Sequence, residues 1–267
     1  MGENTRKNVF IIHGTGGHPK ENWFPWLKER LEPMGCKVII PQFPTPENQT
    51  PKTWFRVLEN YRGEYMPDTI LVAHGLGSAF ALRILEHYPV RIKTAFLVSA
   101  PIGVRPIKNW DGDQPFIGKP FDWNLIRSRA GKFVVFHSDD DPMVGIGNGI
   151  ELAKNLGAEF VRLPNAGHFN AKDFVFGDYT QNQYTIDFQG ILTHELGHDL
   201  GLGDSYYLDN PKCENNTMGS SYGYDGAYNL RTLEFGDKFG LFILYSNLAK
   251  YAKYKDYFMI KQIKYYN

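Results

Sequence analysis

The residues of this chain best suited to bind a metal lie between His194 and Asp204, in the sequence HELGHDLGLGD. Residues four apart share one face of an α-helix, so His194 and His198 can present two imidazoles to one ion. Glu195 is placed to act as general base on a metal-bound water. Gly201 is suited to end the helix, so that Asp204 can supply a third ligand after the turn. Three protein ligands and an open fourth position are typical of catalytic zinc, so this stretch predicts a Zn²⁺ site.

This pattern, His-Glu-x-x-His-x-x-Gly-x-x-Asp, resembles the metzincin zinc peptidases, in the branch that has aspartate as the third ligand. Met218, in NNTMGSSYG, lies where that family has its methionine turn, and residues 236–245 resemble its C-terminal helix. The resemblance implies a zinc-dependent peptidase that cleaves peptides and uses Glu195 as general base. It covers only residues 190–246, because no counterpart of the family's N-terminal sheet lies upstream. The alternative is a surface helix that carries two histidines and binds no metal.

The composition is that of a globular protein without a polyanionic partner. The chain has 267 residues, 42% of them hydrophobic, and its 29 Lys and Arg residues balance its 29 Asp and Glu residues. This balance predicts binding neither to nucleic acid nor to a membrane surface. Cys36 and Cys213 form no CxxC motif, so a disulfide framework is not expected. With no signal-peptide pattern and no apolar run of about eighteen residues, we expect a cytoplasmic protein. Nothing in the sequence indicates an oligomeric state.

Upstream of the histidine-rich stretch, apolar runs alternate with helical patterns. A run such as VFIIH, followed by the glycine-rich GTGG, is typical of a buried parallel strand. Strands are expected at 9–13, 37–41, 69–73, 93–100, 132–138 and 158–164, with helices at 22–35, 50–61 and 76–88. This alternation predicts an α/β fold with a doubly wound parallel sheet, whose strand ends would position further functional side chains.

Five motifs in this part of the chain occur in the order found in a family of small hydrolases. They are HGTGG at 13–17, NWFPWLKERLE at 22–32, LVAHGLGSA at 71–79, SDDDPMV at 138–144 and NAGHF at 165–169. Residues 1–173 thereby resemble the small α/β-hydrolases of the retinoblastoma-binding-protein-9 and YdeN group of serine hydrolases. The resemblance implies an oxyanion loop, a first aromatic helix, a nucleophile elbow, an acid loop and a histidine loop.

One position departs from the family pattern G-x-S-x-G at the elbow. The sequence here is AHGLG, so Gly75 occupies the nucleophile position and brings no hydroxyl. By the resemblance, Asp141 and His168 match the other two members of the catalytic triad. An Asp–His pair without a nucleophile cannot form an acyl-enzyme. Ser78 lies three residues further, within the expected helix, and we expect it to point away from His168.

The sequence predicts two segments: an α/β-hydrolase-like domain over residues 1–173, and a mainly helical, partial metzincin-like zinc segment over residues 174–267. Two functions are open. In the first, the chain is a hydrolase, a zinc-dependent metallopeptidase fused to a serine-hydrolase-like domain that lacks its nucleophile. In the second, the hydrolase domain is a non-catalytic module that binds a small ester-like ligand or a protein partner, and the zinc is structural. Glu195 distinguishes the two hypotheses, since it is essential only to the zinc-dependent peptidase.

Overall fold

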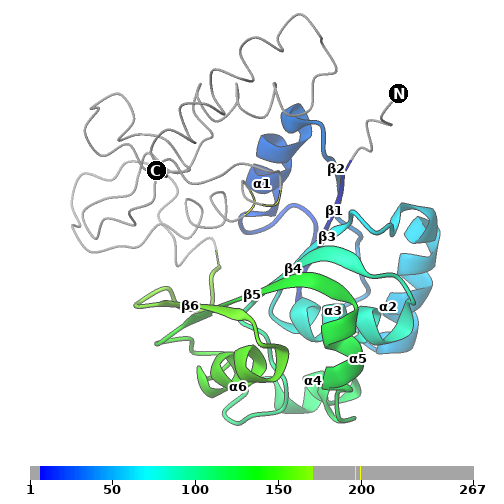
Figure 1. The fold of residues 1–267 in the computed structure, drawn as a ribbon. Coiled ribbons are helices and arrows are strands. Elements are labelled where there is room, and N and C mark those ends of the chain that lie inside the picture. The colour runs from blue at the N-terminus through cyan, green and yellow to red at the C-terminus, as the bar shows by residue number, and fades with distance from the viewer. Residues whose placement is uncertain (1–6, 171–195, 197–198, 200–267) are drawn as a thin grey trace, which may run out of the picture. The chain divides into compact units, whose positions relative to one another are not determined.

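The computed structural model describes residues 7–170 together with Leu196 and Asp199 (Figure 1). The chain forms two compact units, Thr5–Ile186 and Met1–Asn4 with Asp187–Asn267, and residues 7–170 belong to the first of these. The predicted boundary at residue 173 and the helical zinc segment that follows it lie outside the described residues. Over the part of the chain that is described, no helix is long and apolar enough to cross a membrane.

Six parallel strands form one sheet in the order β2-β1-β3-β4-β5-β6, which confirms the predicted parallel α/β sheet (Figure 1). The strands are β1 (Asn8–Ile12), β2 (Lys37–Ile39), β3 (Ile70–His74), β4 (Ile92–Val98), β5 (Ala130–Ser138) and β6 (Glu159–Leu163). Every residue of β1 and β3, two paired strands in the interior of the sheet, is buried. Such continuous apolar strands are expected in a parallel sheet, because helices cover both of its faces.

Helices cover the sheet unequally. They are α1 (Phe24–Leu31), α2 (Pro51–Leu58), α3 (Leu76–His87), α4 (Trp110–Ile117), α5 (Trp123–Ser128) and α6 (Gly147–Leu156), with 3₁₀ turns η1 (Glu32–Met34) and η2 (Glu59–Glu64). In Figure 1, α1 lies on one face of the sheet, and α3, α5 and α6 lie on the other. The reason is the right-handed crossover: the chain steps from β1 to β2 in one direction and from β3 to β6 in the other.

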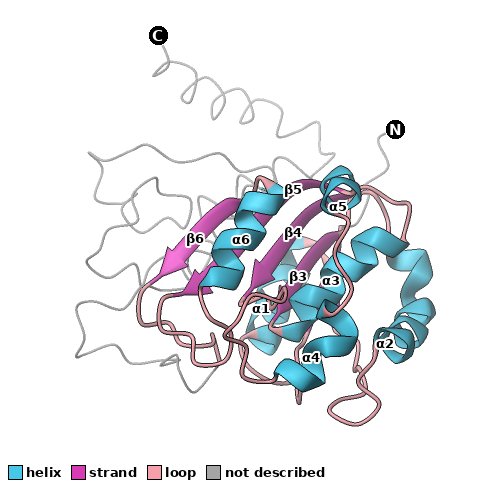
Figure 2. Cartoon of the chain, turned by 90° about the horizontal axis from the view of Figure 1, so that it is seen from below, coloured by secondary structure: helices cyan, strands magenta, loops and turns pink. Residues whose placement is uncertain are grey.

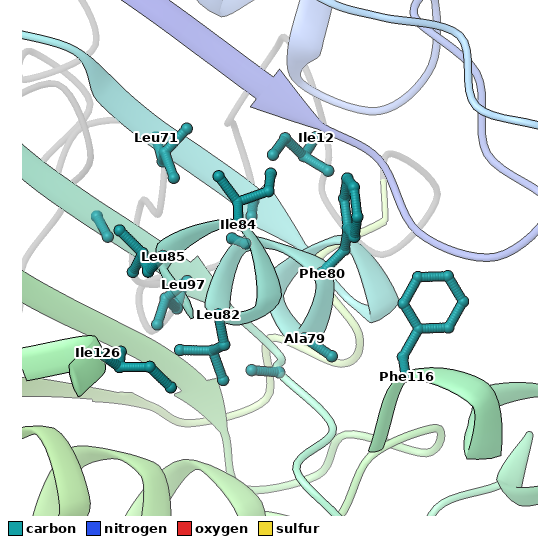
Figure 3. Packing of buried hydrophobic residues seen from close by; sticks show 14 of the residues in the cluster. Ile12, Leu71, Ala79, Phe80, Leu82, Ile84, Leu85, Leu97, Phe116 and Ile126 are labelled. Atoms are coloured by element: carbon teal, nitrogen blue, oxygen red, sulfur yellow. The ribbon is translucent and has the colours of Figure 1, made fainter. Parts of the chain in front are cut away.

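The central helix α3 anchors the turn that precedes it. All ten residues from Leu76 to Leu85 are buried. Figure 3 shows Phe80 and Ile84 from this helix packed against Ile12 and Leu71 of neighbouring strands. Each fully buried aliphatic or aromatic side chain stabilises the fold by roughly 1.5–3 kcal/mol. The start of α3, where the elbow lies, is therefore among the most firmly held points of the molecule.

Helix α4, which the sequence did not predict, is held by its neighbours α2 and α3. Figure 2 shows α4 beside the start of α3. Trp54 of α2 packs edge-on against Phe116 of α4, with ring centroids 4.8 Å apart. Arg83 of α3 donates a hydrogen bond from Nε to the backbone oxygen of Phe116 at 2.9 Å. These contacts fix the position of the side chains that α4 contributes to the site.

Candidate active site

The turn between β3 and α3 has the backbone of a nucleophile elbow. Gly75 has φ 54° and ψ −129°, a conformation that strains any residue with a side chain. The turn also brings backbones into contact, since a Cβ on Gly77 would overlap the carbonyl oxygen of Ile12. A Cβ on Gly14 would lie 3.3 Å from the backbone nitrogen of Leu76, the first residue of α3. The loop after β1 is thus held against the N-terminus of α3, where the first amides have no acceptor within the helix.

The structure brings Asp141 and His168 together. His168 Nδ1 donates to the Asp141 carboxylate at 2.9 and 3.0 Å. Asp141 also accepts hydrogen bonds from Ser99 Oγ at 2.7 Å and from the backbone nitrogens of Met143 and Val144 at 2.8 and 3.0 Å. Burial raises the pKa of Asp141, but the bond and charge of His168 and the other donors outweigh it and hold that pKa below its ordinary value. The carboxylate therefore stays ionised and orients the imidazole.

The two other aspartates of the run that contains Asp141 serve local structure. Asp139 forms an ion pair with Arg162 at the surface. Asp140 accepts a hydrogen bond from the backbone nitrogen of Gly167 at 2.9 Å, which ties the acid loop to the loop that carries His168. Only Asp141 contacts the imidazole among these three residues.

Two buried histidines support the loops around the site. His74 donates from Nε2 to the backbone oxygen of His168 at 2.7 Å. Burial, and then repulsion from His168, lowers the pKa of His74 to about 3, so it is neutral. His13 accepts a bond at Nε2 from the backbone nitrogen of Phe43 at 3.0 Å, and its Nδ1 lies 2.9 Å from the oxygen of Gly14. Burial lowers the pKa of His13 as well. Both rings fix backbone positions.

A cavity of about 480 Å³ opens at the elbow. Gly75 and His168 line it, together with Thr15 from the loop after β1, Glu21 from the segment before α1 and Asp113 from α4. The side chain of His168 is 13% exposed, so the ring is reachable from this space. The volume is sufficient for a small organic ligand. The arrangement is a cleft with a base, a buried acid bonded to that base, and the first residue of α3, Leu76, in its lining.

A family model described as "Serine hydrolase" matches residues 9–186. The chain belongs to the serine hydrolase family. It is 31% identical over 163 residues to the protein YdeN of Bacillus subtilis (strain 168), a match that covers 61% of this chain and 86% of YdeN. The crystal structure of the ydeN gene product has a TM-score of 0.59 and covers 62% of this chain and 90% of that one. A structure of Est1E from Butyrivibrio proteoclasticus with ferulic acid bound, 14% identical with a TM-score of 0.50 over 62% of this chain and 83% of that one, shares the fold alone.

For a member of the serine hydrolase family, the elbow of this chain is unusual in having glycine at its centre. The nearest serine, Ser78, does not replace the missing hydroxyl. It is fully buried, and its Oγ donates to the backbone oxygens of Ala73 and Val98 at 2.8 and 3.1 Å. Ser78 therefore stabilises the start of α3, and its hydroxyl is directed away from the cavity.

The sequence did not identify Asp113 as a residue of this serine hydrolase cleft. It is 4% exposed, and Asn109 Nδ2 donates to its Oδ1 at 2.8 Å. Burial raises the pKa of Asp113 to about 6, although the hydrogen bonds from Asn109 and Thr15 and the charge of His168 oppose the rise. In the sequence, Asp113 is one aspartate in the turn-rich string NWDGDQP. No pattern in this string indicates that Asp113 contacts the loop after β1.

The predicted zinc ligands His194, His198 and Asp204, and the predicted general base Glu195, lie outside the described residues, as does Met218. Within residues 7–170, and with Leu196 and Asp199 included, no group of three or more His, Cys, Asp or Glu side chains is placed to hold a metal. The family match ends at residue 186, before the segment that resembles a metzincin. The Zn²⁺ site remains a prediction from sequence.

Proposed function

We propose that the serine hydrolase domain binds a small ester- or amide-bearing ligand in the cavity at Gly75 and forms no acyl-enzyme with it. The observation that carries this proposal is the orientation of the base. A Cβ added at Gly75 would lie 3.3 Å from His168 Nε2, so this nitrogen faces the position of the missing nucleophile.

The other parts of an acyl-binding site support the proposal. His168 Nδ1 is bonded to Asp141, which leaves Nε2 as the ring atom that meets a ligand. The carbonyl of an ester or amide is suited to the backbone N–H groups at the start of α3 and in the loop near Thr15. Covalent catalysis at this elbow needs a nucleophilic side chain at position 75, and glycine cannot supply one. Reversible binding is the function that the remaining groups support best.

The test compares the full-length wild type with Gly75→Ser and with the matched control Gly75→Ala, which adds the same Cβ but no hydroxyl. Each protein is treated with an alkyl fluorophosphonate, and adducts are measured by intact-mass and peptide mass spectrometry. We expect an adduct at position 75 in Gly75→Ser alone. An adduct on any serine of the wild type would overturn the proposal, because it would reveal another nucleophile.

A second measurement covers the case in which Gly75→Ser does not fold, as judged by circular dichroism. Binding of N-propylbutanamide to the wild type is followed by ligand-observed NMR, in a buffer that contains no competing ligand. We expect saturation transfer from the protein to the amide, and we expect a bulky side chain at the elbow, in Gly75→Leu, to abolish it. Absence of binding to the wild type would refute the proposed function.

A second candidate function concerns the other part of the chain. The five-position pattern that ends at Asp204 favours a zinc-dependent metallopeptidase, in which His194, His198 and Asp204 hold Zn²⁺ and Glu195 activates the water. Elemental analysis of protein purified without chelator is expected to find one zinc per chain, and His198→Ala is expected to lose it. Casein cleavage that a chelator stops and Glu195→Gln abolishes would support the peptidase. Bound zinc without casein cleavage would support a structural metal only. Absence of zinc would refute both the catalytic and the structural metal site.

A further inference from the structure

The cavity at the elbow has acidic walls. Among the described residues that line it, two carry carboxyl groups, Glu21 and Asp113, and none is lysine or arginine. A cleft whose charged walls have one sign attracts ligands of the opposite sign. A ligand with its own carboxylate would meet repulsion at both of these side chains, so the lining disfavours acidic acyl compounds.

The oxygens of Asp113 are used unequally. Asn109 Nδ2 donates to Oδ1 at 2.8 Å, and Thr15 Oγ1 lies 3.4 Å from the same oxygen. No described residue donates a hydrogen bond to Oδ2. Asp113 lines the cavity, and Oδ2 is not a fully enclosed atom, so a ligand in the cavity can reach this oxygen. A carboxylate oxygen that is open to a cavity can accept a charge-assisted hydrogen bond from a cationic ligand, which is stronger than a bond from a neutral donor.

The position of Asp113 is built into α4. A Cβ on Gly112 would lie 2.6 Å from Asn109 Nδ2, so glycine at 112 makes room for the Asn109 side chain to fold back over the helix. Gln49 Nε2 donates to the backbone oxygen of Gly112 at 3.2 Å and ties this turn to the segment before α2. The carboxylate is thus held by a rigid neighbourhood, as a recognition group must be.

A purely structural role explains less. An aspartate that only stabilised the first turn of α4 would be expected to be exposed to solvent or to accept hydrogen bonds at both carboxylate oxygens. Asp113 instead has one bonded oxygen and one oxygen without a described donor. Burial raises its pKa to about 6, so at neutral pH the group is ionised at a cost to folding. Burial also raises the pKa of Glu21. A cation in the cavity would offset the cost at both carboxyl groups.

We propose that the cavity selects cationic acyl compounds, whose carbonyl lies at Gly75 and whose ammonium group is held by Asp113 Oδ2. The inference rests on the proposed function, because it names the class of ligand for the same site. One small molecule can make both contacts, since Asp113, Gly75 and His168 all line the same cavity of about 480 Å³. Aminoalkyl amides and esters are the simplest members of this class.

The experiment measures the dissociation constants of three kinds of butanamide for the full-length protein at pH 7.5. The first kind carries a terminal ammonium on spacers of two, three or four carbons. The second replaces the ammonium with a methyl group, which keeps size and removes charge. The third is N-butanoylglycine, which carries a carboxylate. We expect at least one ammonium amide to bind about tenfold or more tightly than its methyl counterpart, and N-butanoylglycine to bind most weakly.

Two variants test whether Asp113 causes the preference for ammonium amides over methyl amides. Asp113→Asn is expected to reduce the ratio between ammonium and methyl amides to about one while methyl amides still bind. Asp111→Asn removes the same charge from an exposed position in the same helix, and is expected to keep the full ratio. Equal binding of ammonium and methyl amides to the wild type would overturn the inference and leave the proposed function intact. If no amide binds, the proposed function fails instead. Loss of the ratio in Asp111→Asn would also overturn the contact, because it would show a long-range charge effect.

Discussion

Replacing the Asp113 carboxylate with its isosteric amide is expected to stabilise the folded protein at neutral pH. An amide oxygen at this position can accept the bond from Asn109 Nδ2, and the amide nitrogen would take the place of Oδ2 at the cavity. Asp113→Asn therefore removes a buried charge and keeps the shape and the bonded oxygen. Most substitutions of buried residues destabilise a protein, so a gain in stability here is a specific expectation.

The size of the gain follows from the pKa of the carboxyl group. Burial raises the pKa of Asp113 from its ordinary value of 3.8 to about 6. Each pH unit of difference corresponds to about 1.36 kcal/mol, so the ionised carboxylate costs the folded state up to about 3 kcal/mol. The sign follows from proton binding: between pH 3.8 and 6 the folded state holds the proton more tightly than the unfolded state. The cost is absent below this window, grows through it and is complete above pH 6.

The assay is urea unfolding of the full-length wild type, Asp113→Asn and the surface control Asp111→Asn at several pH values from 4.5 to 8. The stability difference between Asp113→Asn and the wild type should reach about 2–3 kcal/mol at pH 8, or roughly 4–12 °C in melting temperature, and should shrink towards pH 4.5. The control should differ from the wild type by less than about 0.5 kcal/mol. A gain that does not change with pH, or a loss of stability at pH 8, would refute the electrostatic reasoning.

Two further substitutions test the frame of the site. Asp141→Asn keeps one acceptor oxygen but places an amide nitrogen against the donors of the other, and is expected to cost about 2–4 kcal/mol at pH 7 by urea unfolding. Because the pKa of Asp141 is lowered, its contribution to stability is present above 3.8, and the difference should narrow as the pH falls through the lowered value. An equal difference at pH 3 and pH 7 would contradict this assignment. Gly77→Ala would overlap the backbone oxygen of Ile12 and is expected to lower stability by about 3 kcal/mol or more, whereas Gly63→Ala, with no atom near its added Cβ, should be close to neutral. A Gly77→Ala protein as stable as the wild type would show that the elbow is looser than described.

The sheet could be predicted from sequence because its signals are local. Each buried strand is an apolar run bounded by glycine or polar residues, and all six predicted strands agree with the structure to within two residues at each end. Helices α4, α5 and α6 were not predicted. Gly112 and Pro115 interrupt the pattern of α4, α5 has only six residues, and Gly147 and Gly149 lie in the first turn of α6. Short helices of this kind are fixed by tertiary contacts, which local periodicity does not record.

The candidate site divides in the same way. Gly75, Asp141 and His168 were predicted from motifs in a known order; the structure places Gly75 and His168 at one cavity and bonds Asp141 to His168. Asp113 could not be found, because its meaning depends on burial and on a neighbour almost a hundred positions away, Thr15. A single aspartate in a turn-rich string has the same local appearance whether it is solvated or faces a ligand.

The backbone at Gly75 gives glycine an advantage in stability over serine at this position. Serine at φ 54° stores strain of about 1–3 kcal/mol, which glycine releases. A lineage that exchanged serine for glycine would therefore have gained stability when it lost the covalent step. Later substitutions that consume this gain can accumulate without harm while glycine is in place. Each of them would make serine at position 75 less tolerable, because the strain of its backbone would no longer be offset.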